Sequence, residues 1–239
     1  MSSLSKKEYL SLKMPTEEAP LSDQQRIVLA LKTLGYEPVT IPLPVLRQLY
    51  PLCRNAEFDI TMTLVHRDAD WVVTHVEAGD QRQHHYGLAV DYGSTSILMQ
   101  LVDQNSGSVI GEEKAYNGQI SFGTDILTRI TYFLEDPSHI RELQKTTTET
   151  FHLLMNQHTE STGIAASQSP IMVVSGNTTM IHFLLGLNAW AVFASPYAPV
   201  TNDPGFLWGH ELGMDFEGLS RIVYASRIYY PLLYGSIVS

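Results

Sequence analysis

The chain has 239 residues, of which 44% are hydrophobic, and carries a formal net charge of −10. Its length accommodates one large or two modest globular domains. The negative charge argues against a nucleic-acid partner, and no apolar run reaches the roughly 18–20 residues that cross a bilayer. Cys53 is the single cysteine, which excludes an internal disulfide framework, and the N-terminus lacks an apolar signal segment. We therefore expect a cytoplasmic protein without a membrane anchor.

The first 83 residues predict a small α+β unit after a flexible segment at residues 1–20. Leu21-Ser-Asp23 offers an N-cap for a helix over 24–34, and Gly35 marks its end. A second short helix is predicted over 43–54. Residues 58–65 and 71–76 alternate as paired strands do, with a polar turn between them. We place this α+β domain at residues 21–83.

A meander follows. An apolar strand beginning near Tyr86 reaches the pattern Asp91-x-Gly93-x-Thr95 and continues as a second, alternating strand up to Asp103. Asn105-Ser-Gly107 is a favourable hairpin turn into a third strand over 109–115.

The Asp91 pattern is a candidate phosphate-binding turn. Its carboxylate can hold a hydrated Mg²⁺, and Gly93 lets backbone N–H groups approach phosphate oxygens. Ser94, Thr95 and Ser96 add short hydroxyl donors. Asp, Gly and Ser are also favoured in ordinary β-turns, so the pattern alone leaves both interpretations open.

Further along, helices are predicted over 121–135 and from about 139 to 158, followed by a buried strand over 171–174. Gly176, Asn177, Thr178 and Thr179 then lead into another helix. A strand, this turn and a helix N-terminus suit an anion, although Asn177 or Thr178 can equally be a simple helix cap. The Pro- and aromatic-rich stretch from Ala194 predicts an ordered surface excursion, which either anchors a partner protein or covers a sheet edge.

Three blocks of sequence together resemble the ATP-dependent reductive activators of corrinoid proteins. They are GLAVDYGSTS at 87–96, the run from Ala115 to Ile130, and VVSGNTTM at 173–180. The resemblance continues through Leu184-Leu-Gly-Leu and Ser195-Pro-Tyr-Ala-Pro, in the same order, from about Leu21 onward. It implies an α/β fold: the small α+β domain, then a ribonuclease-H-like half-domain with a mixed sheet at 84–239, of the actin and sugar-kinase ATPase superfamily.

The resemblance also implies a function. The parent activity is ATP-driven reduction of a corrinoid cofactor from Co(II) to Co(I) in proteins that serve methyl transfer, so the expected cofactors are ATP and Mg²⁺ and the expected partner is a corrinoid protein. Asp91 would hold Mg²⁺ through water, and residues 93–96 would hold phosphates. Residues 176–179 would form the opposite wall, while Asn117, Gln119 and Asp125 would line the cleft or order the phosphate loop.

Two departures from the family pattern matter. Full-length members carry a [2Fe–2S] ferredoxin domain with four cysteines, whereas this chain has only Cys53 and cannot bind that cluster; the donor domain would act in cis or in trans. Residues 230–239 resemble the start of a second ATPase half, so the cleft is expected to be incomplete and ATP to bind weakly. A smaller departure is Gly118, where the family has proline, which would loosen the loop.

Two other functions remain open from the sequence. The chain could be a non-catalytic protein-binding or dimerisation scaffold with an incomplete nucleotide site, and a homodimer is then expected. A small-molecule kinase of the same superfamily would need a substrate pocket from the second half.

Overall fold

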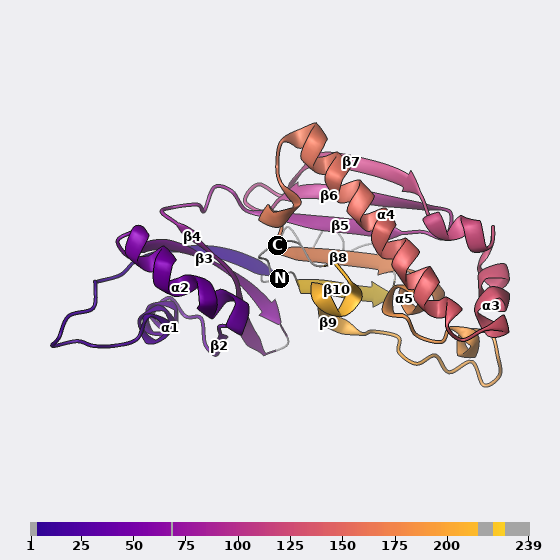
Figure 1. Cartoon of the computed structure of the whole chain (residues 1–239), viewed down its shortest axis with the longest axis horizontal. Helices are drawn as coiled ribbons and strands as arrows, with labels where there is room; N and C mark the ends of the chain where they lie inside the picture. The colour runs from indigo at the N-terminus through magenta and orange to yellow at the C-terminus, as the bar shows by residue number, and fades with distance from the viewer. Residues whose placement is uncertain (1–3, 68, 215–221, 228–239) are drawn as a thin grey trace.

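A computed structural model describes residues 4–67, 69–214 and 222–227, which form two α/β domains side by side (Figure 1). Within these residues, the small domain contains a four-stranded sheet and two α-helices. The larger domain contains a six-stranded sheet and three α-helices. None of the helices in these described ranges is long and apolar enough to cross a membrane.

The small domain's sheet has the strand order β1-β3-β4-β2. Its strands are β1 (Ser5–Ser11), β2 (Val39–Thr40), β3 (Asp59–Arg67) and β4 (Asp70–Ala78). The predicted pairing of the third and fourth strands is confirmed. The prediction of a flexible segment over 1–20 is wrong for Ser5–Ser11, because β1 pairs antiparallel with β3 along its full length. Lys7 is buried there and forms an ion pair with Glu77 of β4.

Two helices cover this sheet, α1 (Asp23–Thr33) and α2 (Leu43–Asn55). The N-cap of α1 is Ser22, since Ser22 and Gln25 form a reciprocal capping box. The helix ends before Leu34, close to the predicted stop at Gly35. The inward faces of both helices pack on the sheet and bury Ile27, Leu31, Val45, Leu49 and Cys53.

The larger sheet has the order β7-β6-β5-β8-β10-β9. The predicted meander is confirmed as β5 (Tyr86–Tyr92), β6 (Ser96–Asp103) and β7 (Ser108–Tyr116), which pair antiparallel. The buried strand β8 (Ile171–Gly176) pairs parallel with β5 and with β10 (Ile222–Arg227), and β9 (Gly205–Trp208) pairs antiparallel with β10. The sheet is therefore mixed.

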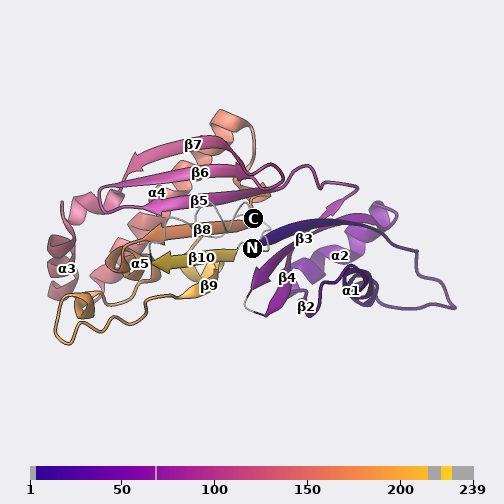
Figure 2. The same ribbon diagram turned by 180° about the vertical axis from the view of Figure 1, so that it is seen from behind.

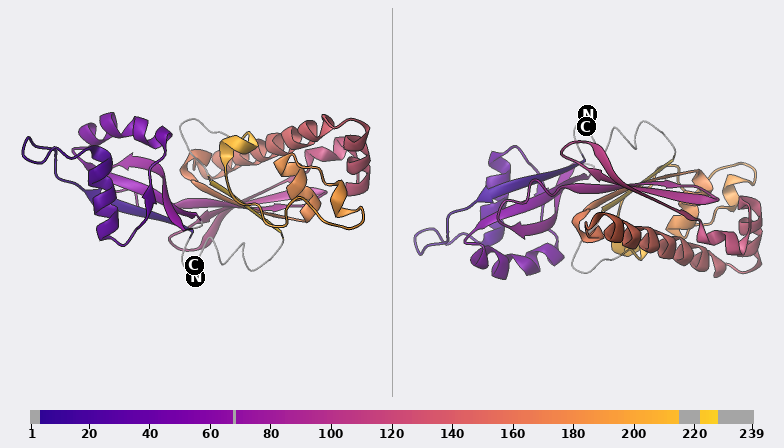
Figure 3. Two further views of the ribbon diagram at one scale, coloured as in Figure 1. Left: turned by 90° about the horizontal axis from the view of Figure 1, so that it is seen from below. Right: turned by 90° about the horizontal axis from the view of Figure 1, so that it is seen from above.

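Helices α3 (Ile126–Glu135), α4 (His139–Thr162) and α5 (Thr178–Leu185) lie on one face of this sheet. In Figure 2, α4 and α5 stand behind the strands and α3 lies beyond the strand ends, and Figure 3 shows the two layers edge-on. The helix predicted from residue 121 is wrong at its start, because residues 118–122 form a separate 3₁₀ helix and Asp125 caps α3. Strands and helices share one core around Val90, Tyr92, Phe151 and Phe183.

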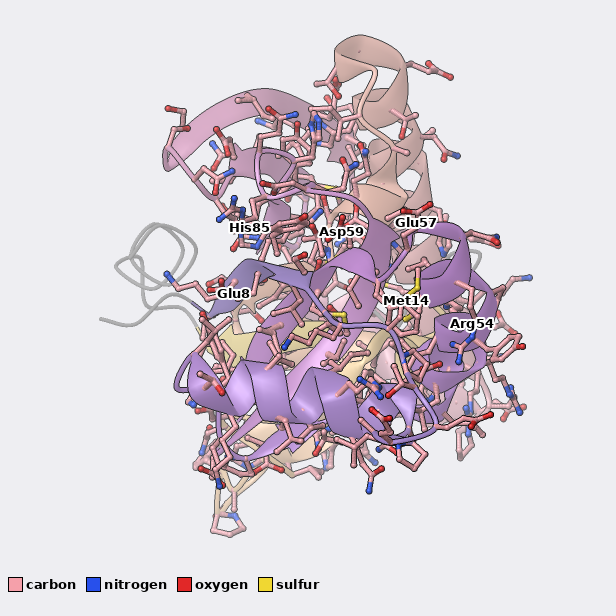
Figure 4. The ribbon with its side chains drawn as sticks, turned by 90° about the vertical axis from the view of Figure 1, so that its left-hand side faces the viewer. Glu8, Met14, Arg54, Glu57, Asp59 and His85 are labelled. Carbon is pink, nitrogen blue, oxygen red and sulfur yellow. The ribbon has the colours of Figure 1, made fainter. Side chains whose placement is uncertain are left out.

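The two domains meet through an apolar cluster. Val65 and Val72 of the small domain pack with Ile171 of β8, against Leu4 and two aromatic residues of β9. His85, labelled in Figure 4, lies at this junction and hydrogen-bonds the Ser5 hydroxyl at 2.9 Å.

The stretch after Ala194 agrees with the edge-covering interpretation where it is regular, because β9 forms the outer strand of the sheet. The predicted start of a second ATPase half at residues 230–239 lies outside the described residues.

Candidate functional site

Two turns lie side by side at one end of the larger sheet, where the strands β5 and β8 finish. The first, residues 93–96, connects β5 to β6, and we call it the Ser94 turn. The second, residues 176–179, connects β8 to α5, and we call it the Asn177 turn. Because β5 and β8 are parallel with Tyr92 opposite Gly176, both turns follow carboxyl ends of neighbouring strands. These ends point away from the small domain (Figure 1). The sheet therefore brings together the two segments that the sequence predicted as opposite walls.

Close backbone approach explains the glycines in both turns. A Cβ added to Gly93 would lie 2.5 Å from the carbonyl oxygen of Ser96, a separation that side-chain atoms do not tolerate. A Cβ on Gly176 would lie 3.0 Å from the Tyr92 carbonyl oxygen. The Ser94 turn can be this tight only with glycine at position 93.

Three successive carbonyl oxygens of the Ser94 turn are held by donors from the protein interior. The Gly93 oxygen accepts from Asn117 Nδ2 at 2.9 Å, and the Thr95 oxygen accepts from the Asn117 backbone N–H at 2.9 Å. Between them, the Ser94 oxygen accepts from Arg129 Nη2 at 2.7 Å. Both donor residues are fully buried.

The fixed carbonyls determine where the N–H groups point. In a planar trans peptide, the C=O of one residue and the N–H of the next point in opposite directions. With the carbonyls of Gly93 and Ser94 directed inward, the N–H groups of Ser94 and Thr95 are directed outward. Within residues 4–67, 69–214 and 222–227, neither of these N–H groups donates a hydrogen bond. Adjacent, unpaired N–H groups form a concave anion-binding site.

Asp91 lies next to this turn on the solvent-exposed side. Its neighbours Val90 and Tyr92 are buried in the helix-side core, so strand alternation places the Asp91 carboxylate on the opposite face. The side chain is exposed, as expected for a group that meets a ligand. No cluster of three His, Cys, Asp or Glu side chains that could hold a metal ion occurs in the described part of the chain. The single exposed Asp91 carboxylate has the chemistry of a group that holds Mg²⁺ through water, an ion that commonly keeps several waters and takes other ligands from phosphate oxygens.

Several groups of the Asn177 turn form contacts that stabilise the start of α5. Asn177 Oδ1 accepts from the Met180 N–H at 3.0 Å, which is a helix N-cap, as the simpler interpretation of this segment proposed. Thr179 is buried, and the Thr178 carbonyl accepts from His182 Nδ1. The side chains of Asn177 and Thr179 are thus committed to the fold, and what faces the Ser94 turn is chiefly backbone at the start of α5.

The three residues expected to line the cleft occupy different positions. Asn117 lies beneath the Ser94 turn and orders it. Gln119 is fully buried and bonds the Leu143 carbonyl and the Thr147 hydroxyl of α4, so the expectation that it lines a cleft is wrong. Asp125 is exposed and caps α3 through the Thr128 N–H, which lowers the pKa of its carboxyl group.

Gly118 does not loosen its loop. A Cβ at this position would lie 2.7 Å from Thr146 Cγ2, and the Gly118 N–H donates to the Thr150 hydroxyl at 3.4 Å. The close approach to Thr146 and the hydrogen bond to Thr150 hold the loop against α4. A proline at this position would have no N–H for that hydrogen bond.

Sequence reasoning missed Arg129 as part of the site. The signal was present, because a charged residue lies beside Ile130 in the apolar stripe of α3, and a charge there needs a specific partner. Burial lowers the pKa of the Arg129 guanidinium, which nevertheless stays protonated at neutral pH. The Tyr92 hydroxyl, also buried beneath the turn, bonds Thr147 at 2.6 Å, and burial raises its pKa.

A cavity of about 530 Å³ adjoins the Ser94 turn. It is lined by Thr95 and Ser96 of the turn and by Lys114, Ala115 and Tyr116 at the end of β7. Lys114 contributes a positive charge next to the outward N–H groups.

Comparison with protein families agrees with this arrangement. The family model described as the RACo middle region matches residues 86–229, and the RACo linker region model matches residues 1–83. The chain belongs to the RACo middle-region family. The boundary between the two matched regions coincides with the junction between the two domains of the structure.

Relatives of this RACo-type chain have related names. The corrinoid activation enzyme RamQ from Eubacterium limosum is 26% identical over 166 residues, which are 70% of this chain and 27% of RamQ. A solved structure named reductive activator for corrinoid, iron-sulfur protein superposes with a TM-score of 0.82 at 28% identity, over 94% of this chain and 36% of that chain. The chain thus spans about a third or less of the length of these relatives. The predicted α/β fold, with its small domain and ribonuclease-H-like half-domain, is confirmed.

A third match, the ethanolamine utilization protein EutJ from Carboxydothermus hydrogenoformans, has 13% identity and a TM-score of 0.30. This similarity is too low to carry a structural argument.

Proposed function

We propose that this chain is part of an activator that uses ATP to reduce the cobalt of a corrinoid protein from Co(II) to Co(I), and that the Ser94 turn holds the nucleotide phosphates. The family membership and the names of its relatives support the corrinoid target. The observation that carries the phosphate assignment is the set of three inward-held carbonyls, which leaves the Ser94 and Thr95 N–H groups pointing outward.

In this proposal, the backbone N–H groups and hydroxyls of residues 93–96 bind phosphate oxygens, and the start of α5 forms the facing wall. Asp91 would hold Mg²⁺ through water. When bound, Mg²⁺ neutralises phosphate charge and orients the transferring group. The residues of this chain supply positioning, and the groups that complete the cleft come from outside the described residues.

The electron must come from another domain or protein. Cys53 is fully buried in the small-domain core, and burial raises the pKa of its thiol, so it does not favour the thiolate that an iron–sulfur cluster needs. We propose that a ferredoxin-type [2Fe–2S] domain, in cis or in trans, delivers one electron to Co(II).

ATP is required in this scheme because the Co(II)/Co(I) couple is too negative for such a donor alone. A nucleotide can shift this balance only through a differential affinity for two conformations. The junction between the small and large domains, formed by the apolar cluster of Val65, Val72 and Ile171, is a surface where two such conformations could differ.

The proposal is tested with nucleotide binding by this chain and by a version extended at both ends. We expect the 239 residues to bind ATP only weakly, through its phosphates, and the longer chain to bind it more tightly, because affinity depends on enclosing the ligand. In the longer chain, Asp91→Asn should weaken Mg²⁺-ATP binding far more than Mg²⁺-free ATP binding. Asp80→Asn, an exposed carboxylate between the domains, is the matched control and should change neither.

A non-catalytic scaffold would give a different result. In that case the longer chain would bind no nucleotide, and sedimentation would show a homodimer whose stability does not depend on Asp91.

A further inference from the structure

Arg129 contacts the Ser94 turn, the loop before α3 and the first turn of α5. Its Nη2 donates to the Ser94 carbonyl at 2.7 Å and its Nε to the Gly123 carbonyl at 2.9 Å. Its Nη1 lies 3.4 Å from Gln119 Oε1 and 3.8 Å from Met180 Sδ. The guanidinium therefore joins the two walls of the proposed phosphate site from below.

The charge of Arg129 has no carboxylate partner in the described part of the chain. The five ion pairs found there involve other cations, and the nearest acidic residue in sequence, Asp125, is exposed and occupied with the cap of α3. A fully buried cation that is hydrogen-bonded only to neutral acceptors carries a large desolvation cost, and the charge of Asp125 offsets it only in part, because burial still lowers the pKa of Arg129. An anion bound nearby would offset part of that cost.

One peptide group connects this cation to solvent. Arg129 donates to the Ser94 oxygen, and the N–H of the same peptide belongs to Thr95 and points outward. A charge-assisted hydrogen bond to the carbonyl polarises the peptide and strengthens its N–H as a donor.

We infer that Arg129 is a positioning residue of the Ser94 turn: it fixes the Ser94 carbonyl inward and supplies positive charge beneath the site, which favours ligands with at least two negative phosphate groups. This inference rests on the proposed function. Arg129 contacts no ligand itself and acts through the peptide between Ser94 and Thr95.

The test uses the 239-residue chain with Arg129→Met, Arg129→Lys and the control Arg54→Met. Methionine approximates the length of arginine without its charge or donors. Arg54 pairs with Asp23 and lies at the small-domain end that faces the viewer in Figure 4, so its loss should leave the turn unchanged. Two readouts are needed: hydrogen exchange of the Asn117 backbone amide, which donates to the Thr95 carbonyl, measured without ligand, and a pyrophosphate titration followed by amide chemical shifts.

We expect Arg129→Met to speed exchange of the Asn117 amide and to weaken pyrophosphate binding by about tenfold, the effect of losing roughly 1.4 kcal/mol. Arg129→Lys should restore part of the affinity by restoring charge, but not the wild-type amide shifts, because lysine lacks the planar fork. If Arg129→Met proves unfolded, Arg129→Lys alone decides the point through those shifts.

Unchanged exchange and unchanged affinity in a folded Arg129→Met protein would overturn the inference. Failure of the wild-type chain to bind pyrophosphate would instead count against the phosphate site, and the exchange measurement without ligand would still decide whether Arg129 holds the turn.

Discussion

Each of the two turns of the β5–β6–β7 meander connects a pair of antiparallel strands, but they differ in which residues hold them in place. The β6–β7 turn is satisfied by its own residues: Asp103 accepts from the Asn105 N–H, the Ser106 hydroxyl and the Gly107 N–H. The Ser94 turn is held instead by Asn117 and Arg129, which are 24 and 35 residues away from the carbonyls they hold. A turn that satisfies itself has little left for a ligand, whereas one held from below keeps its outer donors free.

The strongest test of this contrast replaces the glycine of each turn. Gly93→Ala would place a Cβ 2.5 Å from the Ser96 carbonyl oxygen, so we expect a loss of about 3 kcal/mol in the free energy of unfolding. Gly107→Ala must tolerate a left-handed φ of 75°, at a cost of about 1 kcal/mol. Urea unfolding measures both, and only Gly93→Ala should abolish pyrophosphate binding. Equal costs would show that the Ser94 turn is no tighter than an ordinary hairpin.

The second prediction concerns the end of the meander opposite the Ser94 turn, where His85 makes stability depend on pH. Burial, with smaller contributions from Lys7 and Lys6, lowers the pKa of His85 to about 4. In the unfolded chain, His85 takes up a proton near pH 6.5. Its contribution to the free energy of unfolding is therefore fully present above that pH and is lost as the pH falls from about 6.5 to about 4, by roughly 2 to 3 kcal/mol. His85→Gln should remove most of this dependence, as measured by urea unfolding across that range. His84→Gln, next to it in sequence, should retain it; the same loss in both variants would assign the effect elsewhere.

A third prediction compares the two asparagines. Asn117→Ala leaves the buried Gly93 carbonyl without its donor and should cost about 2 kcal/mol. It should also speed hydrogen exchange of the backbone N–H at position 117, which donates to the Thr95 carbonyl. Asn105→Ala removes a surface hydrogen bond to the Arg82 carbonyl and should cost only about 0.5 kcal/mol. Similar costs for both would mean that holding the Ser94 turn from a distance contributes nothing beyond local turn chemistry.

The same contrast explains how much of the molecule the sequence predicts. The Asn105 turn, the capped helices and the alternating strands depend on neighbouring residues, and their patterns located them to within a few positions. The Ser94 turn was predicted from Asp91 and Gly93, and ordering of this loop by Asn117 was one of two roles that the resemblance implied. Arg129 was missed, because a charge in the apolar stripe of α3 shows that a partner is needed but not that the partner is residue 94.

Two errors have the same physical origin. Strand β1 was overlooked because its inward positions include Ser5 and Lys7, polar residues that are buried only through partners on β4 and beside β5. Gln119 was assigned to the cleft or the phosphate loop only through the family resemblance, whereas α4 supplies acceptors that bury it. In both cases, a distant partner decides what a polar side chain does.

The central claim is that the outward N–H groups of Ser94 and Thr95 bind phosphate. It is tested most directly by titrating the wild-type chain with pyrophosphate and following every backbone amide by NMR. We expect the largest saturable shifts at Ser94 and Thr95, and none at Ser106 and Gly107 in the opposite turn. Saturable shifts elsewhere with Ser94 and Thr95 unmoved would contradict the claim.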